Sequence, residues 1–492
     1  MESLLTNTYF WVVLAYFAVV LFISFFTKKL ASRSSADFLV AGRNLGLLVC
    51  SMVVAAEWLG GLSTVGVSEK AFDTLTLQPI LYNFSTAIGM VILGFTLAKA
   101  YRERKVNTVS EMVESIFGKR ARSISAIAFL IAFITLAYVE LTTFATVLSP
   151  IFNINWVWAV IIAATITTIY TYMGGMHALT IVAVFNLVVR YVGLGIALII
   201  GLVAIGDFSN LTNRLVEIGA PQNLYNPFSI GWNAALSLIL GGIFGGMASQ
   251  ASIQPIFAAK NPITAKRAAI LSAVFIAPFG IITGILGLIA RSGLFFEVTP
   301  GFNPKMALPR LLMTPEFVHP VIGGIAIAAI LAAILSTIGP VSFSIVTIAT
   351  KDIYHGLINK KASDEKILQF AKRLVILVNL VTVPLALFMK GAILDAGYFS
   401  YAIRTIGAIV ILLGIYKLKW ISTLSVQLSF IGGTLAIIIS IVAKKFGWFD
   451  IDKTYASIIA TVFFIIIGNI YTKYFTGKQK SSELNINESA TK

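Results

Sequence analysis

Charged residues are scarce in this sequence. Only 12% of the 492 residues are Asp, Glu, Lys or Arg, whereas 58% are hydrophobic and the mean hydropathy is +0.90. A soluble globular protein has roughly 25% charged residues, so the composition excludes a soluble enzyme and a disordered chain. The net charge of +16 does not indicate a nucleic-acid partner, because it belongs to a chain that is mostly apolar.

Cysteine is nearly absent as well. The one cysteine, Cys50, lies in an apolar run, which excludes a disulfide framework and a thiolate metal site. No paired carboxylates, Ser-His-Asp arrangement or phosphate-binding loop is found in the sequence. We therefore predict neither an enzyme nor a nucleotide-driven pump.

Long apolar runs dominate the sequence instead. A bilayer core of about 30 Å is crossed by roughly 20 apolar residues in a helix. On this criterion we predict an all-α integral membrane protein with about 13 transmembrane helices. The predicted spans are 9–26, 45–67, 77–97, 124–148, 156–173, 179–205, 232–257, 268–290, 318–348, 374–389, 398–416, 421–442 and 456–471.

The basic residues predict an orientation. If the N-terminus is outside, most of the 37 Lys and Arg residues fall in cytoplasmic loops and the C-terminal tail, as the positive-inside rule requires. One cluster comprises Arg102, Arg104, Lys105, Lys119, Arg120 and Arg122. We expect a multi-pass cell-membrane protein with a cytoplasmic C-terminus, in contact with the anionic lipid of the inner leaflet.

The chain is predicted to form one transmembrane domain, at 1–476, with no separate soluble domain. The core is expected at 45–416, with an accessory first span at 9–26 and two accessory spans at 421–471. A polar cytoplasmic tail follows at 477–492. No obligate protein partner is evident.

Two spans carry glycine pairs near their middles. The second has Gly60-Gly61, and the seventh has Gly241-Gly242 and Gly245-Gly246. These spans are five segments apart, which is the spacing of the two broken helices in a five-plus-five inverted-repeat transporter core. We therefore predict helix breaks at these glycines. The alternative is that they only permit close helix packing.

The ninth span combines a proline with two hydroxyls. Pro340 lacks an N–H group, so the Ser336 carbonyl loses its helical partner, and a third helix break is predicted there. Ala333, Ser336 and Thr337 lie at i, i+3 and i+4 and share one face. Hydroxyls and freed carbonyls on one face suit a small hard cation. Alternatively, the hydroxyls bond back to their own helix.

Several motifs together resemble the sodium/solute symporter family, in particular its proline- and choline-carrier branches. They are DFLVAGRNLG at 37–46, YTYMGGMHAL at 170–179, AAILSTIGP at 332–340, KDIY at 351–354 and the A-x-W-x-G-G pattern at 56–61. The resemblance implies sodium as the coupling ion and a small organic solute as the partner. It places sodium between the second and ninth spans, at the carbonyls of Ala56, Leu59 and Ala333 and the hydroxyls of Ser336 and Thr337.

Two departures from the family pattern bear on the mechanism. Many members have Thr-Asp where this chain has Val182-Ala183, so the resemblance favours a single sodium ion without carboxylate assistance. The usual Gln-Arg at the end of the seventh span is Gln254-Pro255 here, which leaves the inner gate unassigned.

Four ionisable residues fall within predicted spans: Glu57, Glu140, Arg190 and Arg404. Such residues are costly in a membrane and default to functional candidates. They can pair with each other and recognise nothing. Otherwise, a free Arg404 favours a carboxylate solute, and Glu57 beside Trp58 favours an amine or a quaternary ammonium. The predicted substrate-binding residues are Glu57, Trp58, Tyr82, Asn83, Glu140, Phe244, Tyr401 and Arg404.

The sequence thus predicts a sodium-coupled symporter that imports a small organic solute by alternating access about a midplane site. Proton coupling through Glu57 or Glu140 is one alternative. A non-transporting sensor is another, although the short tail argues against an appended signalling domain. A channel is a third, although no filter sequence is found.

Overall fold

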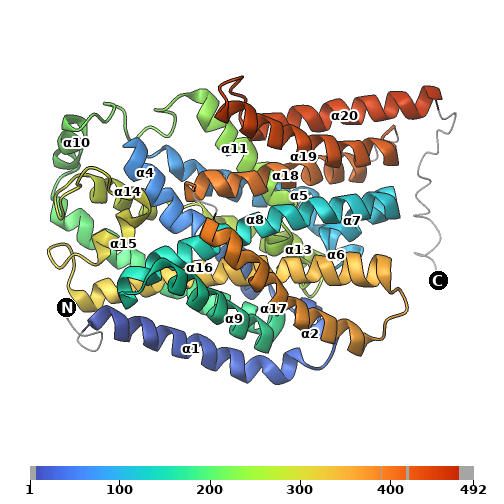
Figure 1. The fold of residues 1–492 in the computed structure, drawn as a ribbon, viewed down its shortest axis with the longest axis horizontal. Coiled ribbons are helices and arrows are strands. Elements are labelled where there is room, and N and C mark those ends of the chain that lie inside the picture. The colour runs from blue at the N-terminus through green and yellow to red at the C-terminus, as the bar shows by residue number, and fades with distance from the viewer. Residues whose placement is uncertain (1–6, 389–390, 417–419, 476–492) are drawn as a thin grey trace.

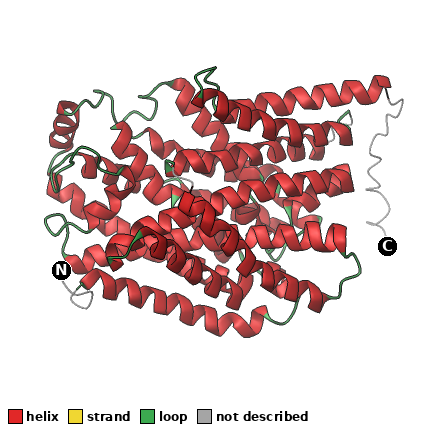
Figure 2. Cartoon of the chain, viewed as in Figure 1, coloured by secondary structure: helices red, strands yellow, loops and turns green. Residues whose placement is uncertain are grey.

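Helices form all the regular secondary structure in the described part of the chain, which comprises residues 7–388, 391–416 and 420–475 of a computed structural model (Figures 1 and 2). Eleven helical segments are long and apolar enough to cross a membrane, and one bent helix pair makes a twelfth. The predicted all-α, multi-pass membrane class is confirmed. Met389, the predicted end of the tenth span, and the predicted tail at 477–492 lie outside the described residues.

The longest helix, α9 (Trp156–Ile205), contains two predicted spans. Its 50 residues correspond to about 75 Å at 1.5 Å per residue, more than twice the thickness of a bilayer core. Gly175 within it is non-helical, with φ +49° and ψ −145°. A side chain at Gly175 would collide with Phe38, and glycine tolerates this backbone conformation. If α9 is counted as two spans, the total number of spans equals the predicted thirteen, although no loop separates these two.

The first half of the core begins with a broken span. It comprises α3 (Leu47–Trp58), the π-helical turn η3 (Leu62–Gly66) and α4 (Val67–Thr74). The two arms bend by 56°, so the break predicted at Gly60-Gly61 is confirmed. The half continues with η4 (Gln78–Ile80) and α5 (Leu81–Thr96), then α8 (Lys119–Phe152) and α9.

The second half of the core repeats the succession of spans found in the first half, beginning with an interrupted span. Its spans are α11 (Trp232–Met247) with α12 (Gln250–Phe257), α13 (Pro262–Ile276) with α14 (Phe279–Arg291), α16 (Pro320–Ile348) with the π-helix η6 (Ala349–Ile358), α17 (Asp364–Phe388), and α18 (Ile393–Ile415). Helix α16 lies at the centre of the bundle. In its apolar, membrane-crossing stretch 83% of the residues are buried, against 33% in that of α17. It packs on α9, α8, α1 and α3, so the ninth span forms the heart of the core.

Three further spans flank these halves: α1 (Thr8–Ala31), α19 (Thr423–Lys445) and α20 (Lys453–Phe475). Helix α1 begins at the left end of the bundle and α20 ends at the right end (Figure 1), as an odd number of crossings requires. Short helices lie between the spans, at α2 (Ser35–Val40), η2 (Ala41–Arg43), α6 (Ala98–Glu103), α7 (Val109–Phe117), α10 (Phe208–Glu217), η5 (Pro304–Met306) and α15 (Ala307–Leu312).

The breaks predicted at Gly241, Gly242, Gly245 and Gly246 are wrong. All four lie inside the continuous helix α11. A side chain at Gly242 would collide with Ser85 of α5, and a Cβ at Gly245 would lie 2.9 Å from that of Tyr401 on α18. These glycines permit close helix packing. The span is interrupted just beyond them, at Ala248 and Ser249, where Ser249 is extended with φ −79° and ψ 108°.

The break predicted at Pro340 is also wrong. Helix α16 runs through this proline from Pro320 to Ile348. A proline removes only its own N–H bond, and in a tightly packed helix neighbouring groups can satisfy the freed backbone. The Tyr170 hydroxyl, which donates to the Leu335 carbonyl at 3.1 Å, shows that α9 packs closely on this part of α16, next to the Ser336 carbonyl that the proline frees.

Candidate functional site

The break in the second span lies directly against α16. Helix α3 ends at Trp58, so the carbonyls of its last turn have no helical partner. The Thr337 hydroxyl donates to the Glu57 carbonyl at 2.6 Å, and the Ser336 hydroxyl lies 2.9 Å from the Ala56 carbonyl. Gly60 allows this approach, because a side chain there would collide with the Thr337 hydroxyl. The two helices are therefore joined through main-chain oxygens.

The residues predicted to bind sodium are brought together at this junction. Ser336 also lies 2.8 Å from the Ala333 carbonyl, within its own helix. The oxygens of Ala56, Leu59, Ala333 and Ser336 form one cluster, and Thr337 adjoins it through Glu57. All five predicted residues are buried. Neutral hard oxygens of this kind suit sodium.

A buried arginine from α9 occupies the centre of this cluster. Arg190 Nη1 donates to the Ala56 carbonyl at 3.0 Å and to the Leu59 carbonyl at 2.6 Å, and Nη2 donates to the Ser336 hydroxyl. Its Nε donates to the Asn186 carbonyl, one turn earlier, at 3.1 Å. The sequence identified Arg190 as an intramembrane charge, but it carries no signal for this location, because Ala56 lies 134 residues away along the chain.

Glu140 of α8 binds the other side of the break. Its Oε2 accepts the Gly61 N–H at 2.9 Å, near the start of η3 and α4, where an anion is favourable. Its Oε1 is buried without a hydrogen-bond partner among the described residues. We predicted Glu140 as a substrate-binding residue, but the contact that the structure gives it is with the broken backbone.

Glu57 and Arg404 contact the second break, at Ala248 and Ser249, and the first turn of α12 after it. The Ser252 hydroxyl donates to Glu57 Oε2, and Arg404 Nη1 donates to the Ser249 hydroxyl at 2.6 Å. The two serines thus hold side chains of opposite charge one helical turn apart. Arg404 Nη2 is buried without a partner among the described residues. Sequence reasoning missed both serines, since only a glycine break was sought in this span.

Aromatic side chains surround this pair of charges. The Arg404 guanidinium lies over the Tyr401 ring, with its carbon 4.0 Å from the ring centroid, and 5.8 Å from that of Trp58. The Tyr82 and Tyr401 hydroxyls are 2.6 Å apart. Trp58, Tyr82 and Tyr401 are buried, and the indole N–H of Trp58 has no partner in the described part of the chain. Three of the predicted aromatic residues therefore form one cluster with Glu57 and Arg404.

Two predicted substrate residues lie differently. Asn83 donates to the Ser63 hydroxyl at 2.7 Å and to the Ile276 carbonyl at 3.2 Å, so it joins α5 to η3 and α13. Asn83 follows Tyr82 directly in α5. Because successive residues of a helix point about 100° apart, the two side chains point in different directions. Phe244 is half-buried on α11, next to the glycine that packs on Tyr401.

The four intramembrane charges do not pair with each other. Among the ion pairs of the described residues, none joins Glu57, Glu140, Arg190 or Arg404 to another of the four. Neutral hydroxyls and main-chain groups contact them instead. Among the described residues, no direct ion pair therefore joins two of these four side chains.

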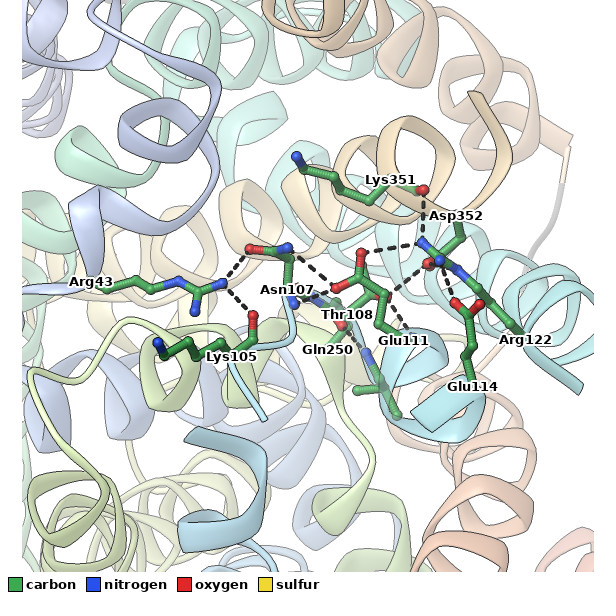
Figure 3. A network of polar contacts seen from close by, with 11 residues as sticks. Arg43, Lys105, Asn107, Thr108, Glu111, Glu114, Arg122, Gln250, Lys351 and Asp352 are labelled. Atoms are coloured by element: carbon green, nitrogen blue, oxygen red, sulfur yellow. Dashed lines mark hydrogen bonds and ion pairs between the residues drawn. The ribbon is translucent and has the colours of Figure 1, made fainter. Parts of the chain in front are cut away.

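A dense polar network, the Arg122 network, closes the end of the bundle where α2, α6 and α7 lie (Figure 3). Arg122 contacts Asp352 at 2.8 Å, Glu114 at 2.5 Å and Glu111 at 3.1 Å. Gln250 of α12 accepts the Val109 N–H at 2.8 Å. The labelled members are Arg43, Lys105, Asn107, Thr108, Glu111, Glu114, Arg122, Gln250, Lys351 and Asp352.

The contacts of the Arg122 network cross between the two halves of the fold. They join α7 and α8 of the first half to α12 and η6 of the second. Gln254 adds two further contacts. Its Nε2 donates to the Leu39 carbonyl at 2.6 Å and to the hydroxyl of Thr347, on α16, at 3.2 Å. Val182 and Ala183, at the first of the two departures from the family pattern, are buried in α9.

A cavity of about 1100 Å³ lies elsewhere, between α8, α18 and α19. It is lined by residues such as Ile131, Tyr138 and Ile438 and includes none of the predicted site residues. Its lining also includes the charged residues Lys70, Asp395, Lys444, Asp452 and Lys453. Because it lies apart from the Glu57–Arg404 cluster, we do not assign it to the solute.

Comparison with known proteins places this geometry in a family. The model of the sodium:solute symporter family matches residues 38–423. The sodium/proline symporter 2 of Staphylococcus saprophyticus is 24% identical over 95% of this chain and 93% of its own length. The high-affinity choline transporter 1 of Torpedo marmorata is 25% identical over 68% of this chain, which spans only 59% of that relative.

Solved structures agree in fold. A sodium-coupled sialic acid symporter in a substrate-bound, outward-open state has a TM-score of 0.80 at 21% identity, covering 95% of this chain and 98% of its own. A nucleobase-cation-symport-1 family transporter in a closed conformation has a TM-score of 0.60 at 14% identity, covering 90% and 96%. The architecture is that of a transporter built from inverted repeats. The chain therefore belongs to the sodium:solute symporter family, whose members are sodium-coupled transporters and not enzymes.

Proposed function

We propose that this sodium-coupled symporter imports a small zwitterionic solute, which carries a carboxylate and an amine or ammonium group. The observation that supports the solute class is the opposite charge of Glu57 and Arg404, held one turn apart by Ser252 and Ser249. Arg404 has a buried Nη2 without a hydrogen-bond partner among the described residues, and it can donate to a carboxylate. Glu57, next to Trp58, can accept from an ammonium group.

The relatives are compatible with this class. By their names, one similar protein carries proline, which has both charges, and others carry choline, which has the cation alone. The cluster differs from a purely cationic site because Arg404 is fully buried beside it. An unpaired arginine repels a cation unless the same molecule brings an anion. Simple amines are therefore not expected to be substrates.

We propose that sodium binds at Ala56, Leu59, Ala333, Ser336 and Thr337, and that it joins the α3 break to α16. An ion that binds one conformation better than another shifts the population toward that conformation. Sodium at this junction would stabilise the state in which the adjacent Glu57 and Trp58 are in place for the solute. The free energy for solute uptake would come from the sodium gradient and from the membrane potential, which contributes about 2.3 kcal/mol per charge per 100 mV.

Transport is proposed to proceed by alternating access, with the N-terminus outside and the Arg122 network at the cytoplasmic end. At the opposite end, Lys70 of α4 lies 3.2 Å from Asp395 of α18, and Glu69 accepts the Ile393 N–H at 3.0 Å. The Lys70–Asp395 pair is partly exposed, which makes it weak. The outer contacts are thus easier to open than the Arg122 network, as an outward-opening step requires.

The test is uptake by proteoliposomes of the full chain, with labelled proline as the probe and an inward sodium gradient. Unlabelled zwitterions should compete, whereas propionate and choline at the same concentration should not. Glu57→Gln and Arg404→Gln should each strongly reduce uptake at a proline concentration that half-saturates the unmodified chain. The control Thr461→Ala, within α20 and bonded only to Ser457 of that helix through its hydroxyl, should retain it. Competition by choline without any by zwitterions would overturn the assignment of the solute.

A further inference from the structure

Arg190 raises a question that the proposed function leaves open, because its guanidinium lies where sodium is proposed to bind. We propose that Arg190 is a tethered cation that fills the sodium site when sodium is absent, and that sodium binds by displacing it. The inference rests on the proposed sodium site and goes beyond it by assigning a competitor for that site.

The first support is the identity of the acceptor oxygens. Arg190 donates to the Ala56 carbonyl, the Leu59 carbonyl and the Ser336 hydroxyl, which are three of the five groups proposed to bind sodium. Each oxygen would direct the same lone pairs at the ion. Two cations cannot share these atoms in a buried site, because both would be desolvated and would repel each other.

The second support is that these oxygens need hydrogen-bond donors whenever no ion is bound. The carbonyls of Ala56 and Leu59 are freed by the end of α3, and buried carbonyls without donors are unfavourable. The Arg190 guanidinium supplies planar, fixed donors that satisfy both carbonyls. The site is therefore stable without sodium, and the arms of the break stay joined to α9.

The third support is a second acceptor at the same break, where Glu140 holds the Gly61 N–H and Arg190 holds the Leu59 carbonyl. Glu140 interacts electrostatically with Arg190, and its Oε1 is buried without a hydrogen-bond partner among the described residues. Glu140 Oε2 is already held by the Gly61 N–H at 2.9 Å. A guanidinium that leaves the carbonyls can move to the free oxygen without leaving the break.

The Arg190 side chain is also held near its base, at Nε. Arg190 Nε is anchored on the Asn186 carbonyl, and the Tyr16 hydroxyl donates to Asn186 Oδ1 at 3.0 Å. Only the terminal part of a long, flexible side chain has to move. The exchange also favours sodium release, because the guanidinium returns to the oxygens as the ion leaves.

The test is a sodium titration of the purified full-length chain, followed by thermal unfolding at constant ionic strength with potassium as the balancing ion. A ligand that binds only the folded protein raises the melting temperature. If the arginine-filled state predominates by about ten to one, removing the guanidinium lowers the half-saturating sodium concentration about tenfold. Arg190→Gln should show this shift, and Arg190→Lys, which keeps the charge but loses the planar donors, a smaller one.

Glu140→Gln provides an independent variant that moves the titration the other way. It keeps an acceptor for the Gly61 N–H but removes the charge that would receive Arg190, so it should raise the half-saturating sodium concentration. If Arg190→Gln does not fold, this variant still tests the proposal. The control is Arg267→Gln, an exposed arginine on α13, which should titrate as the unmodified chain does.

The outcomes separate this inference from the proposed function. Opposite shifts in Arg190→Gln and Glu140→Gln support the tethered cation. Equal sodium affinity in Arg190→Gln and the unmodified chain overturns it and leaves the sodium site in place. A sodium response only after Arg190 is replaced shows that the arginine is permanent, which overturns both displacement and sodium coupling. No response in either protein overturns the sodium site itself.

Discussion

The hydroxyl of Thr337 donates to the main-chain carbonyl of Glu57 at 2.6 Å and so joins two helices that are 280 residues apart in the sequence. This contact exists because Gly60 carries no side chain and α3 stops at Trp58. It connects the proposed sodium ligands on α16 to Glu57, whose side chain belongs to the proposed solute site. The two sites are therefore adjacent along one interrupted helix.

Replacing Gly60 by alanine should inactivate the protein. The new Cβ would collide with the Thr337 hydroxyl, and overpacking of this kind typically costs about 1–3 kcal/mol. Sodium-dependent uptake and the sodium-induced rise in melting temperature should both be lost.

Gly195→Ala is the matched control for Gly60→Ala. Gly195 also lies within a span, in α9, but no atom lies within 4 Å of the position of an added Cβ. The alanine should leave uptake unchanged and leave stability equal or slightly higher, since alanine is the better helix former. Equal activity of both alanine variants would contradict the proposed role of Gly60.

Replacing Arg404 by glutamine should weaken zwitterion binding selectively. A hydrogen bond to a charged group contributes about 1.5–3 kcal/mol, so the apparent affinity should fall about ten- to a hundredfold. Competition assays with zwitterions of graded length would measure it. A competing simple amine should gain affinity in the same variant, because the repulsion by Arg404 is removed.

Disrupting the Arg122 network should open its end of the bundle. Arg122→Gln removes three ionic contacts and leaves the fully buried Asp352 unpaired, which is costly. Cys50 is the only cysteine in the sequence, is buried in α3, and lies with its sulfur 3.2 Å from the Pro255 carbonyl of α12. Its labelling rate with a membrane-permeant maleimide should rise at least about tenfold, which corresponds to about 1.4 kcal/mol.

Lys99→Gln serves as the control for that experiment. It breaks the Lys99–Glu103 pair on α6, whose side chains are largely exposed, and such pairs contribute little. Cys50 labelling should therefore remain slow. Rapid labelling of the control, or slow labelling of Arg122→Gln, would contradict the assignment of the network as a gate.

The sequence was most informative where local chemistry decides the structure. Gly60-Gly61 predicts a real break, and the i, i+3, i+4 spacing of Ala333, Ser336 and Thr337 places the oxygens that meet it. The same reasoning failed at Gly241 to Gly246, because the sequence alone does not distinguish a glycine that permits close helix packing from one that ends a helix. Only the tertiary neighbours Ser85 and Tyr401 distinguish the two.

Contacts between distant segments could not be predicted from one sequence. Arg190 reaches oxygens on α3 and α16, and Arg122 meets Asp352 from 230 positions away. The charges of both arginines were visible, but their partners depend on how the helices pack. The serines at 249 and 252 gave no signal, since hydroxyls are common in membrane helices and most bond to their own backbone.

The most direct test of the sodium-coupled mechanism is proline uptake by proteoliposomes under an inward sodium gradient without a pH gradient. The unmodified chain should accumulate proline, and Ser336→Ala combined with Thr337→Ala should abolish accumulation at equal expression, because two of the proposed sodium ligands are lost. Unchanged accumulation in the double variant, or uptake driven by a pH gradient in sodium-free vesicles, would contradict the account.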